Sequence, residues 1–365
     1  SRDVMRGGSR GGEETESIRH AHVELGRDGG GTELDASPAA LLQKFSDAIQ
    51  KYAATPNDTV AARSAVAAAW TLASSLNEAT ALVQGVRAQA DADIASSVDN
   101  LNSLLERFGK LNTEIVKGTR SGADVTDYED QRDQILLQMS EEVGIKTITR
   151  ANGDMAVYTD SGVTLFDKTA RTVSFQPTLT YGAGTTGNAV YADGVPITGG
   201  NATMAVDSGR LSSLVTVRDD LAVTYQNQLD EIARGLIAAF AESDQSAVPA
   251  LPDVPGLFTW SGAPALPAGA TLSTGLAGDI SVNALVDPNQ GGNVALLRDG
   301  GIGGAAYVYN AGGNASFTDR LQQLYDNLNA TQAYDPAAGV TTAATLAAFA
   351  SSSVAWLEEA RNTAG

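Results

Sequence analysis

Apolar residues recur at alternating steps of three and four over a long stretch that follows Pro56. This alternation is typical of a coiled-coil seam, and it predicts one long α-helix with a continuous apolar stripe. A helix of about 60 residues is roughly 90 Å long, which exceeds a compact domain of this mass, so we expect a rod with other helices along it. The seam positions are Leu72, Leu76, Ala79, Val83, Val86, Ala90, Ile94, Val98, Leu101, Leu105, Phe108, Leu111 and Ile115.

A shorter helix is predicted before the long one. It begins at Ser37-Pro38, an N-cap residue followed by proline at the first helical position, and it ends before Pro56. Asn57 or Asp58 then caps the long helix.

A second shorter helix is predicted after the long one. The segment KGTRSGAD (117–124) indicates a turn, and the chain returns as an antiparallel helix capped by Thr126 or Asp127. Its inward face is expected to contain Ile135, Leu136 and Met139.

From Gly144 the apolar period becomes two, which predicts β-strands. Asn152-Gly153 and residues 160–162 are turn signals between these strands. The β pattern continues to about residue 206 in short runs, and it indicates a small sheet or a barrel-like lobe.

The helical period returns after Ser208-Gly209 and predicts a third long helix. Residues 247–300 are rich in proline and glycine and predict an irregular, partly β insertion, while the segment 300–314 predicts a flexible loop. Two further helices, SFTDRLQQLYDNLNAT and TLAAFASSSVAWLEEARNTAG, close the chain.

Together these segments predict a mainly α protein with β insertions (α+β). Its helices form one elongated bundle that the C-terminal helices complete, and small β-rich lobes are inserted into it. The predicted divisions are a flexible or atypical N-terminal segment (1–36), a helical rod (37–145), a β-hairpin-rich lobe (146–207), a middle rod helix (208–244), an irregular or β insertion (245–314) and the C-terminal rod helices (315–365).

Charge and composition narrow the function. The 365 residues carry a net charge of −19, which argues against nucleic acid and anionic membrane as partners, because both attract basic proteins. The absence of cysteine excludes disulfides, thiolate zinc sites and cysteine nucleophiles. The two histidines, His20 and His22, are interpreted as exposed and unpaired, and no cofactor is expected. The sequence contains neither an apolar run of 18 residues nor a signal-peptide pattern.

An acidic cluster is the main candidate for chemistry. The stretch DVTDYEDQRDQILLQMS (124–140) contains the motif Asp127, Asp130, Gln131, Arg132 and Asp133. It can be a helix start favoured by the helix dipole, an adventitious cation site or an enzyme centre. A calcium loop needs a DxDxDG spacing and catalysis needs a buried carboxylate of raised pKa, so the structural interpretation is favoured. In that interpretation Arg132 pairs with a carboxylate of this helix or of the next.

Other candidate sites are weaker. The sequence contains no P-loop, no glycine-rich dinucleotide motif between a strand and a helix, and no GxSxG nucleophile elbow. Trp260 and Trp356 can serve as ligand platforms, although packing in a core or an interface is the commoner role of such residues.

Three stretches resemble the family of flagellar hook-associated protein 1, the first junction protein between hook and filament. The first is KFSDAIQKYAATPNDTVAARSAVAAAW. The second contains the paired Leu101-Asn102 and Leu111-Asn112 steps, then the acidic D-x-x-D-Q-R-D turn at 127–133 and a β-hairpin. The third, SGRLSSLVTVRDDLAVTYQ, carries Arg218-Asp219. Family members also begin with an apolar heptad helix and end with a matching one, which this chain does not show, so we expect it to assemble poorly alone.

The resemblance implies a flagellin-like, non-enzymatic protein of the bacterial flagellum. Such a protein is exported by the flagellar type III apparatus without a cleaved signal peptide and lies outside the cell at the hook–filament junction. The implied partners are the hook protein, the second hook-associated protein, an export chaperone and further copies in a ring. In this setting the motif is expected to anchor the corner between helix and hairpin, with Arg132 holding the acidic residues in register. The alternative is a cell-surface binding module, an adhesin or a polysaccharide binder, that uses the β lobes and Trp260.

Overall fold

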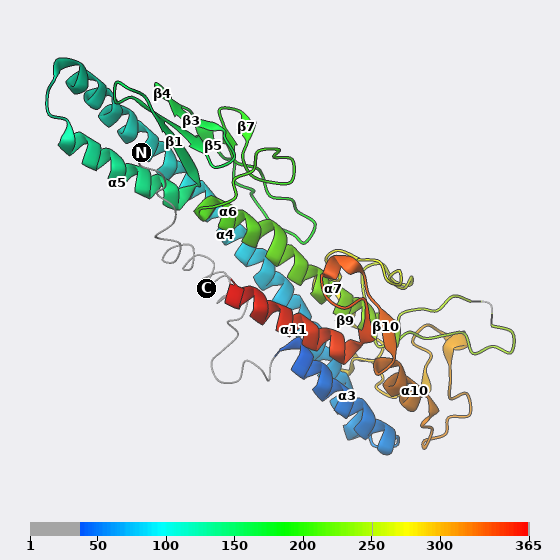
Figure 1. Ribbon diagram of the computed structural model, residues 1–365. Helices are drawn as coiled ribbons and strands as arrows, with labels where there is room; N and C mark the ends of the chain where they lie inside the picture. The colour runs from blue at the N-terminus through cyan, green and yellow to red at the C-terminus, as the bar shows by residue number, and fades with distance from the viewer. Residues whose placement is uncertain (1–36, 250, 364–365) are drawn as a thin grey trace. The chain divides into compact units, whose positions relative to one another are not determined.

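The computed structural model describes residues 37–249 and 251–363, whose course is drawn in Figure 1. Helices dominate, and the β-structure is confined to small antiparallel sheets, which confirms the predicted mainly α class with β insertions. The chain divides into two compact units. The described part of the first unit is Gln84–Ala222 with residues 361–363, and that of the second is residues 37–83, 223–249 and 251–360.

The predicted long helix is confirmed as α4 (Thr59–Ser121), which is continuous over 63 residues. Its predicted seam positions are buried except for Ala79 and Leu111, which are partly exposed. Of the two predicted capping residues, Asp58 is the one used, because its Oδ1 accepts a hydrogen bond from Val60 N at 2.8 Å.

In the first unit, α5 (Thr126–Glu142) returns antiparallel to the C-terminal part of α4, as predicted (Figure 1). Its N-cap prediction is wrong, because the cap residue is Val125 and it contributes no side-chain hydrogen bond. Asp124 takes this role instead. Its Oδ1 accepts from Thr126 N at 3.0 Å and from Thr126 Oγ1 at 2.7 Å. A short carboxylate that bonds the backbone two residues on forms an Asx-turn, which serves the same donors as a cap.

A four-stranded antiparallel sheet in the order β1-β2-β3-β4 packs in the first unit. The strands are β1 (Ile145–Thr149), β2 (Met155–Thr159), β3 (Thr164–Asp167) and β4 (Thr169–Ala170). Both predicted turns are confirmed, and at the first of them Gly153 has a φ of +81°, a conformation that glycine adopts without strain. Phe108 of α4 packs edge-on against Phe166 of β3 with ring centroids 4.9 Å apart, which seats the sheet on the helix.

The β-structure expected from there to residue 206 is much sparser. A three-stranded sheet is formed by β5 (Val173–Ser174), β6 (Tyr191–Ala192) and β7 (Val195–Pro196). Residues 175–190 contain no strand, so the expectation is wrong for this segment. Pro177 and several glycines interrupt it, and neither residue type sustains a hydrogen-bonded ladder.

The third long helix is present but interrupted. It consists of α6 (Arg210–Thr216), the π-helical segment η1 (Val217–Leu221) and α7 (Ala222–Ala239). A π-helical turn accommodates one extra residue, which an apolar period of three and four does not reveal.

In the second unit, α3 (Pro38–Ala54) starts as predicted, since Ser37 Oγ accepts from Ala40 N at 3.2 Å. Three aromatic rings form the centre of this unit. Phe45 of α3 lies 5.0 Å from Phe240 and 5.5 Å from Phe258, measured between ring centroids. Phe258 belongs to β8 (Phe258–Thr259), which pairs with β9 (Ser281–Val282).

Both predicted C-terminal helices are confirmed as α10 (Asp319–Leu328) and α11 (Leu346–Thr363). The sequence pattern does not reveal the hairpin between them, β10 (Thr331–Ala333) and β11 (Ala343–Thr345). The remaining short elements are α8 (Leu276–Asp279), η2 (Pro288–Gln290), α9 (Leu296–Asp299), η3 (Ala305–Tyr307) and η4 (Pro336–Ala338).

The glycine-rich loop 300–314 is more ordered than expected. Gly301 N donates to Tyr307 O at 2.9 Å, and Gly303 N donates to Glu242 Oε2 at 2.7 Å. Because Glu242 is buried just after α7, this carboxylate fastens the loop to the second unit. Within the part of the chain that the structure describes, every helix is too short or too polar to span a bilayer.

Candidate functional site

The five residues singled out in the sequence lie near the start of α5, and they face two ways. Asp127, Asp130, Gln131 and Asp133 are exposed, whereas Arg132 is 4% exposed. An α-helix turns about 100° per residue, so Arg132 points into the unit while its acidic neighbours point outward. The structure therefore brings one member of the motif into a polar cluster and leaves four on the surface.

Arg132 reaches the turn between β1 and β2. Its Nη1 donates to Gly153 O at 2.8 Å and to Asn112 Oδ1 at 3.3 Å. Asn112 of α4 also accepts from Met155 N at 3.0 Å and donates to Asp154 Oδ1 at 2.8 Å. The expected partner of Arg132, a carboxylate, is thus replaced by an amide and a backbone carbonyl. That the motif anchors this corner stays a prediction.

Compensation of the Arg132 charge is incomplete in the described structure. Burial lowers the pKa of Arg132, and the charges of Asp133, Glu129 and Asp154 offset this only in part. Its Nε is buried without a hydrogen-bond partner among the described residues. Arg132 is therefore held mainly by uncharged acceptors.

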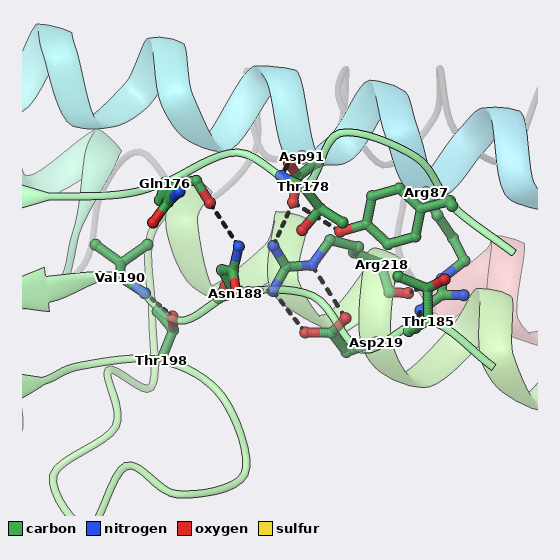
Figure 2. Close-up of polar contacts among 11 residues, drawn as sticks. Arg87, Asp91, Gln176, Thr178, Thr185, Asn188, Val190, Thr198, Arg218 and Asp219 are labelled. Carbon is green, nitrogen blue, oxygen red and sulfur yellow. Dashed lines mark hydrogen bonds and ion pairs between the residues drawn. The ribbon is translucent and has the colours of Figure 1, made fainter.

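A second buried arginine, Arg218 in η1, is held very differently (Figure 2). Its Nη1 donates to Asp91 Oδ1 of α4 at 2.7 Å, and its Nε and Nη2 form a fork on Asp219 at 3.0 and 2.7 Å. Nη2 also donates to Asn188 O at 2.9 Å. All three guanidinium nitrogens are engaged. Burial acts to lower the pKa of Arg218, but the bonds and charges of Asp219 and Asp91 outweigh it and raise the pKa.

This cluster fastens the strandless segment 175–190 to the first unit. Asp91 accepts from Thr178 N and from Tyr181 Oη, each at 2.7 Å. Arg87 donates to the carbonyl of Thr185 at 2.5 Å, and its guanidinium lies 4.7 Å from the centroid of the Tyr181 ring. A Cβ atom at position 187 would lie 2.3 Å from the guanidinium of Arg218, so only glycine lets the segment pass this closely. In the segment 175–190, hydrogen bonds from polar side chains thus take the place of the backbone hydrogen bonds that a β-sheet would provide.

Two further contacts of the same kind tie segments to α4. Asn102 exchanges a pair of hydrogen bonds with the backbone of Val173, at 2.8 and 3.1 Å. Glu142 at the end of α5 is buried and accepts from Asn100 Nδ2 at 2.6 Å and from Ser97 Oγ. Along the first unit, α4 therefore holds the segment 175–190, the end of α5, β5 and the β1–β2 turn in succession.

In the second unit, charged residues of α7 play a comparable part. Arg234 Nη2 donates to Glu231 Oε2 at 2.9 Å and to Ala333 O at 2.6 Å, which fixes β10 on the helix. Asp230 accepts from the backbone N–H groups of Gly275 and Ala277, both at 2.8 Å. Burial raises the pKa of Asp230 although these bonds act against it.

Apart from Arg132 Nε, the buried polar groups described above direct their hydrogen bonds to other parts of the protein, so the arrangement fixes the local geometry. Among the described residues, no group of three or more His, Cys, Asp or Glu side chains is placed to hold a metal ion. His20 and His22 lie outside the described residues. Trp260 donates its indole N–H to Ala265 O at 2.8 Å, and Trp356 is partly buried on α11.

The family resemblance marks Asn102, Asn112 and Arg218-Asp219, but sequence reasoning missed Arg87, Asp91 and Glu142. A signal was available for the residues on α4. Arg87, Asp91 and Asn112 each follow a seam position directly, and a polar residue beside the seam is partly drawn into the core.

Comparisons with known proteins point in one direction. The family model described as "Flagellar hook-associated protein FlgK helical domain" matches residues 32–251. Flagellar hook-associated protein 1 of Escherichia coli (strain K12) is 24% identical over 257 residues, which are 69% of this chain and 45% of that relative. The protein of the same name from Salmonella typhimurium (strain LT2) is 25% identical over 211 residues, which are 56% of this chain and 37% of the relative.

The structure of the flagellar hook junction protein FlgK from Burkholderia pseudomallei is similar in fold, with a TM-score of 0.51 at 19% identity. The aligned part covers 68% of this chain and 45% of that one. The chain thus spans less than half the length of the relatives that it matches, and nothing in these matches favours an adhesin. Because the family model covers more than half of the residues, including the α4–α5 corner and η1, the resemblance is confirmed: the chain belongs to the family of the flagellar hook-associated protein FlgK helical domain.

Proposed function

We propose that this chain is a structural, non-enzymatic part of the bacterial flagellum and acts at the junction between hook and filament. The match of the family model over residues 32–251 carries this proposal. The names of the relatives and of the protein with the similar fold, which speak of the hook and its junction, support it.

The proposed partners follow from this role. They are the hook protein on one side, the second hook-associated protein on the other, and neighbouring copies of the chain in a ring. The chain reaches this place outside the cell through the flagellar type III export apparatus, and an export chaperone accompanies it. The net charge of −19 supports the absence of nucleic acid and membrane among its partners.

The physical contribution of the described units is a fixed shape. A junction subunit transmits force between two different assemblies, so its helices and loops must keep their relative positions within a unit. Buried polar contacts have specific directions, unlike apolar packing, and they permit few alternative registers. In the first unit, the buried contacts of Arg132, Arg218 and Glu142 supply this directional restraint on how helices and loops pack.

Immunogold electron microscopy tests the proposal directly. Antibodies raised against the purified chain are applied to isolated flagella of the bacterium that encodes it, and we expect a narrow band of gold where hook meets filament. Gold spread along the filament, or confined to the cell envelope, contradicts the proposal.

A matched strain with an inactive flagellar export ATPase serves as the control. The antigen is expected to stay inside these cells, whereas a protein exported by another route still reaches the surface. Antibody pre-adsorbed with the purified chain corrects for background label.

A further inference from the structure

We propose that the first unit binds a second copy of this chain head to tail, through an acidic stripe on α5 of one copy and a basic groove between α4 and α5 of the next. The inference rests on the proposed function, because a ring of subunits needs a repeating contact, and it names the surfaces that make that contact.

The groove is a feature of the α4–α5 pair. It has a volume of about 250 Å³. Arg107 and Lys110 of α4 form one rim, and three glutamines of α5 form the other, namely Gln131, Gln134 and Gln138. Leu111 and Ile135 supply an apolar floor between the rims. The lining contains no acidic side chain, so the groove carries a local charge of about +2, from Arg107 and Lys110, in a strongly acidic chain.

The two cations of the groove have no partner among the described residues. Arg107 and Lys110 form neither a hydrogen bond nor an ion pair there. One turn or two further along α4 the situation differs, since Lys117 is paired with Glu114 at 2.7 Å. Glu106 and Glu114 lie one helical turn to either side of Lys110 on α4, but neither forms an ion pair with it in the described structure, so both cations of the groove stay available for a carboxylate of another copy.

The complementary surface is the outward stripe of α5. Asp130, Asp133, Leu137 and Glu141 follow one another at steps of three, four and four, so they lie on one face of the helix. All four are exposed, and the Leu137 residue is 55% exposed. The three carboxylates form no hydrogen bond or ion pair within the described part of the chain. An exposed leucine framed by carboxylates matches an apolar floor framed by cations.

The stripe and the groove lie on neighbouring faces of α5, and within one copy the carboxylates of the stripe form no ion pair with Arg107 or Lys110 among the described residues. Between copies they give a heterologous contact, which leaves one free stripe and one free groove at the ends. Such contacts propagate into a ring when the rotation closes and into a helical array when it does not. Exposed ion pairs are individually weak, so we expect an association that depends on high local concentration and falls with added salt.

Carbodiimide cross-linking tests this contact, since it joins a carboxylate directly to an amine in contact with it. Equal amounts of ¹⁵N-labelled and unlabelled full chain are cross-linked and the linked peptides are read by mass spectrometry. We expect mixed-label pairs that join Lys110 to Asp130 or Asp133, and a fall of several-fold in their yield when salt is raised. Mixed-label pairs that lack Lys110 overturn the proposal.

Charge reversal sharpens the test. The groove variant R107E/K110E and the stripe variant D130K/D133K should each lose the dimer band at least several-fold, and an equimolar mixture of the two should regain it, because each supplies the surface that the other lacks. The control K117E/R120E makes the same charge change on the same helix outside the groove and should keep the wild-type yield. Failure of the mixture to recover, or an equal loss in the control, overturns the proposal, provided circular dichroism shows wild-type helix content.

The outcome is separable from that of the proposed function. If the gold label lies at the junction while the mixture fails to recover, the inferred contact is wrong and the function stands. If the mixture recovers while the label is absent from the junction, self-association stands and the proposed function falls.

Discussion

Arg218 and Arg132 are both buried in the first unit, yet their charges are balanced in different ways. Arg218 forks onto Asp219 and bonds Asp91, so all three of its nitrogens are used, and its pKa is raised. Arg132 bonds Gly153 O and the amide of Asn112, leaves its Nε without a partner among the described residues, and its pKa is lowered. One arginine is part of a charge network, and the other is a donor to neutral groups.

The difference predicts what each arginine does to stability. When a buried ion pair loses one partner, the partner that remains is a buried charge, and this costs more than the pair itself contributes. When a donor to neutral acceptors is removed, the acceptors that remain lose a hydrogen bond, which costs less. Arg218 should therefore matter more than Arg132, although the sequence draws attention to Arg132.

The largest effect is expected for Arg218→Ala. Asp91 is 2% exposed and would keep only the bonds from Thr178 N and Tyr181 Oη among the described residues, so we expect a loss of about 3–5 kcal/mol in the free energy of unfolding. Urea denaturation measures the loss, and hydrogen exchange of the segment 175–190 locates it. As a control, the substitution Arg120→Ala at an exposed position of α4 should change neither the free energy of unfolding nor the hydrogen exchange of this segment. A loss under about 1 kcal/mol would show that Asp91 finds other compensation.

A smaller effect is expected for Arg132→Ala, on the order of 1–3 kcal/mol. Asn112 Oδ1 keeps its bond from Met155 N in this variant, so the β1–β2 turn loosens without losing its attachment to α4. The melting curve of the full chain measures the change, with hydrogen exchange of residues 145–155 as the local readout. An unchanged curve would mean that Arg132 is not an anchor, and the predicted role of the motif would fall with it.

Tyr181→Phe probes the charge network more gently. It removes the Oη–H bond to Asp91 but keeps the ring beneath Arg87, so we expect a loss of about 1 kcal/mol. The same readout, exchange protection of the segment 175–190, should fall by roughly a factor of five, the equivalent of about 1 kcal/mol. If Tyr181→Phe costs as much as Arg218→Ala, the hydroxyl and not the arginine sets the order of this segment.

The contrast also explains how far the sequence could be interpreted. Apolar periods place α3, α4, α5 and the C-terminal helices correctly. The buried face of a helix requires an apolar residue every three or four positions, so the pattern can be recognised from residues that are close together in the sequence. The pairing of Asp91 with Arg218 joins residues 127 positions apart, and no local pattern encodes it. The π-helical turn that presents Arg218 is equally invisible in a pattern of steps of three and four.

Local chemistry is hard to predict where several short polar residues compete for one task. Thr126 and Asp127 both have the residue types of an N-cap, yet Asp124 takes the free backbone N–H of Thr126 because the turn brings its carboxylate back over the helix start. The acidic motif at 127–133 also shows how much of the local chemistry the sequence alone can predict. The spacing indicates that Arg132 and the acidic residues differ in direction, but only the three-dimensional arrangement shows that Asn112 lies on the inner side.

The smallest predicted effect concerns Asp154, which lies beside the β1–β2 turn that Arg132 contacts, and the pH dependence of its contribution to stability. Burial acts to raise the pKa of Asp154, but its bonds from Asn112 and Arg150 outweigh this and lower the pKa. A carboxyl group whose pKa is lowered in the folded state contributes stability at pH values above the pKa of the unfolded chain, about 3.9, and that contribution is lost as the pH falls through the folded-state pKa.

Asp154→Asn should therefore cost up to about 1 kcal/mol in the free energy of unfolding at pH 7 and progressively less below about pH 4, as measured by urea denaturation at pH 7 and below pH 4. The exposed Asp99→Asn is the control. A cost for Asp154→Asn that is independent of pH would mean that its shape, and not its charge, holds Asn112 and Arg150 at the corner.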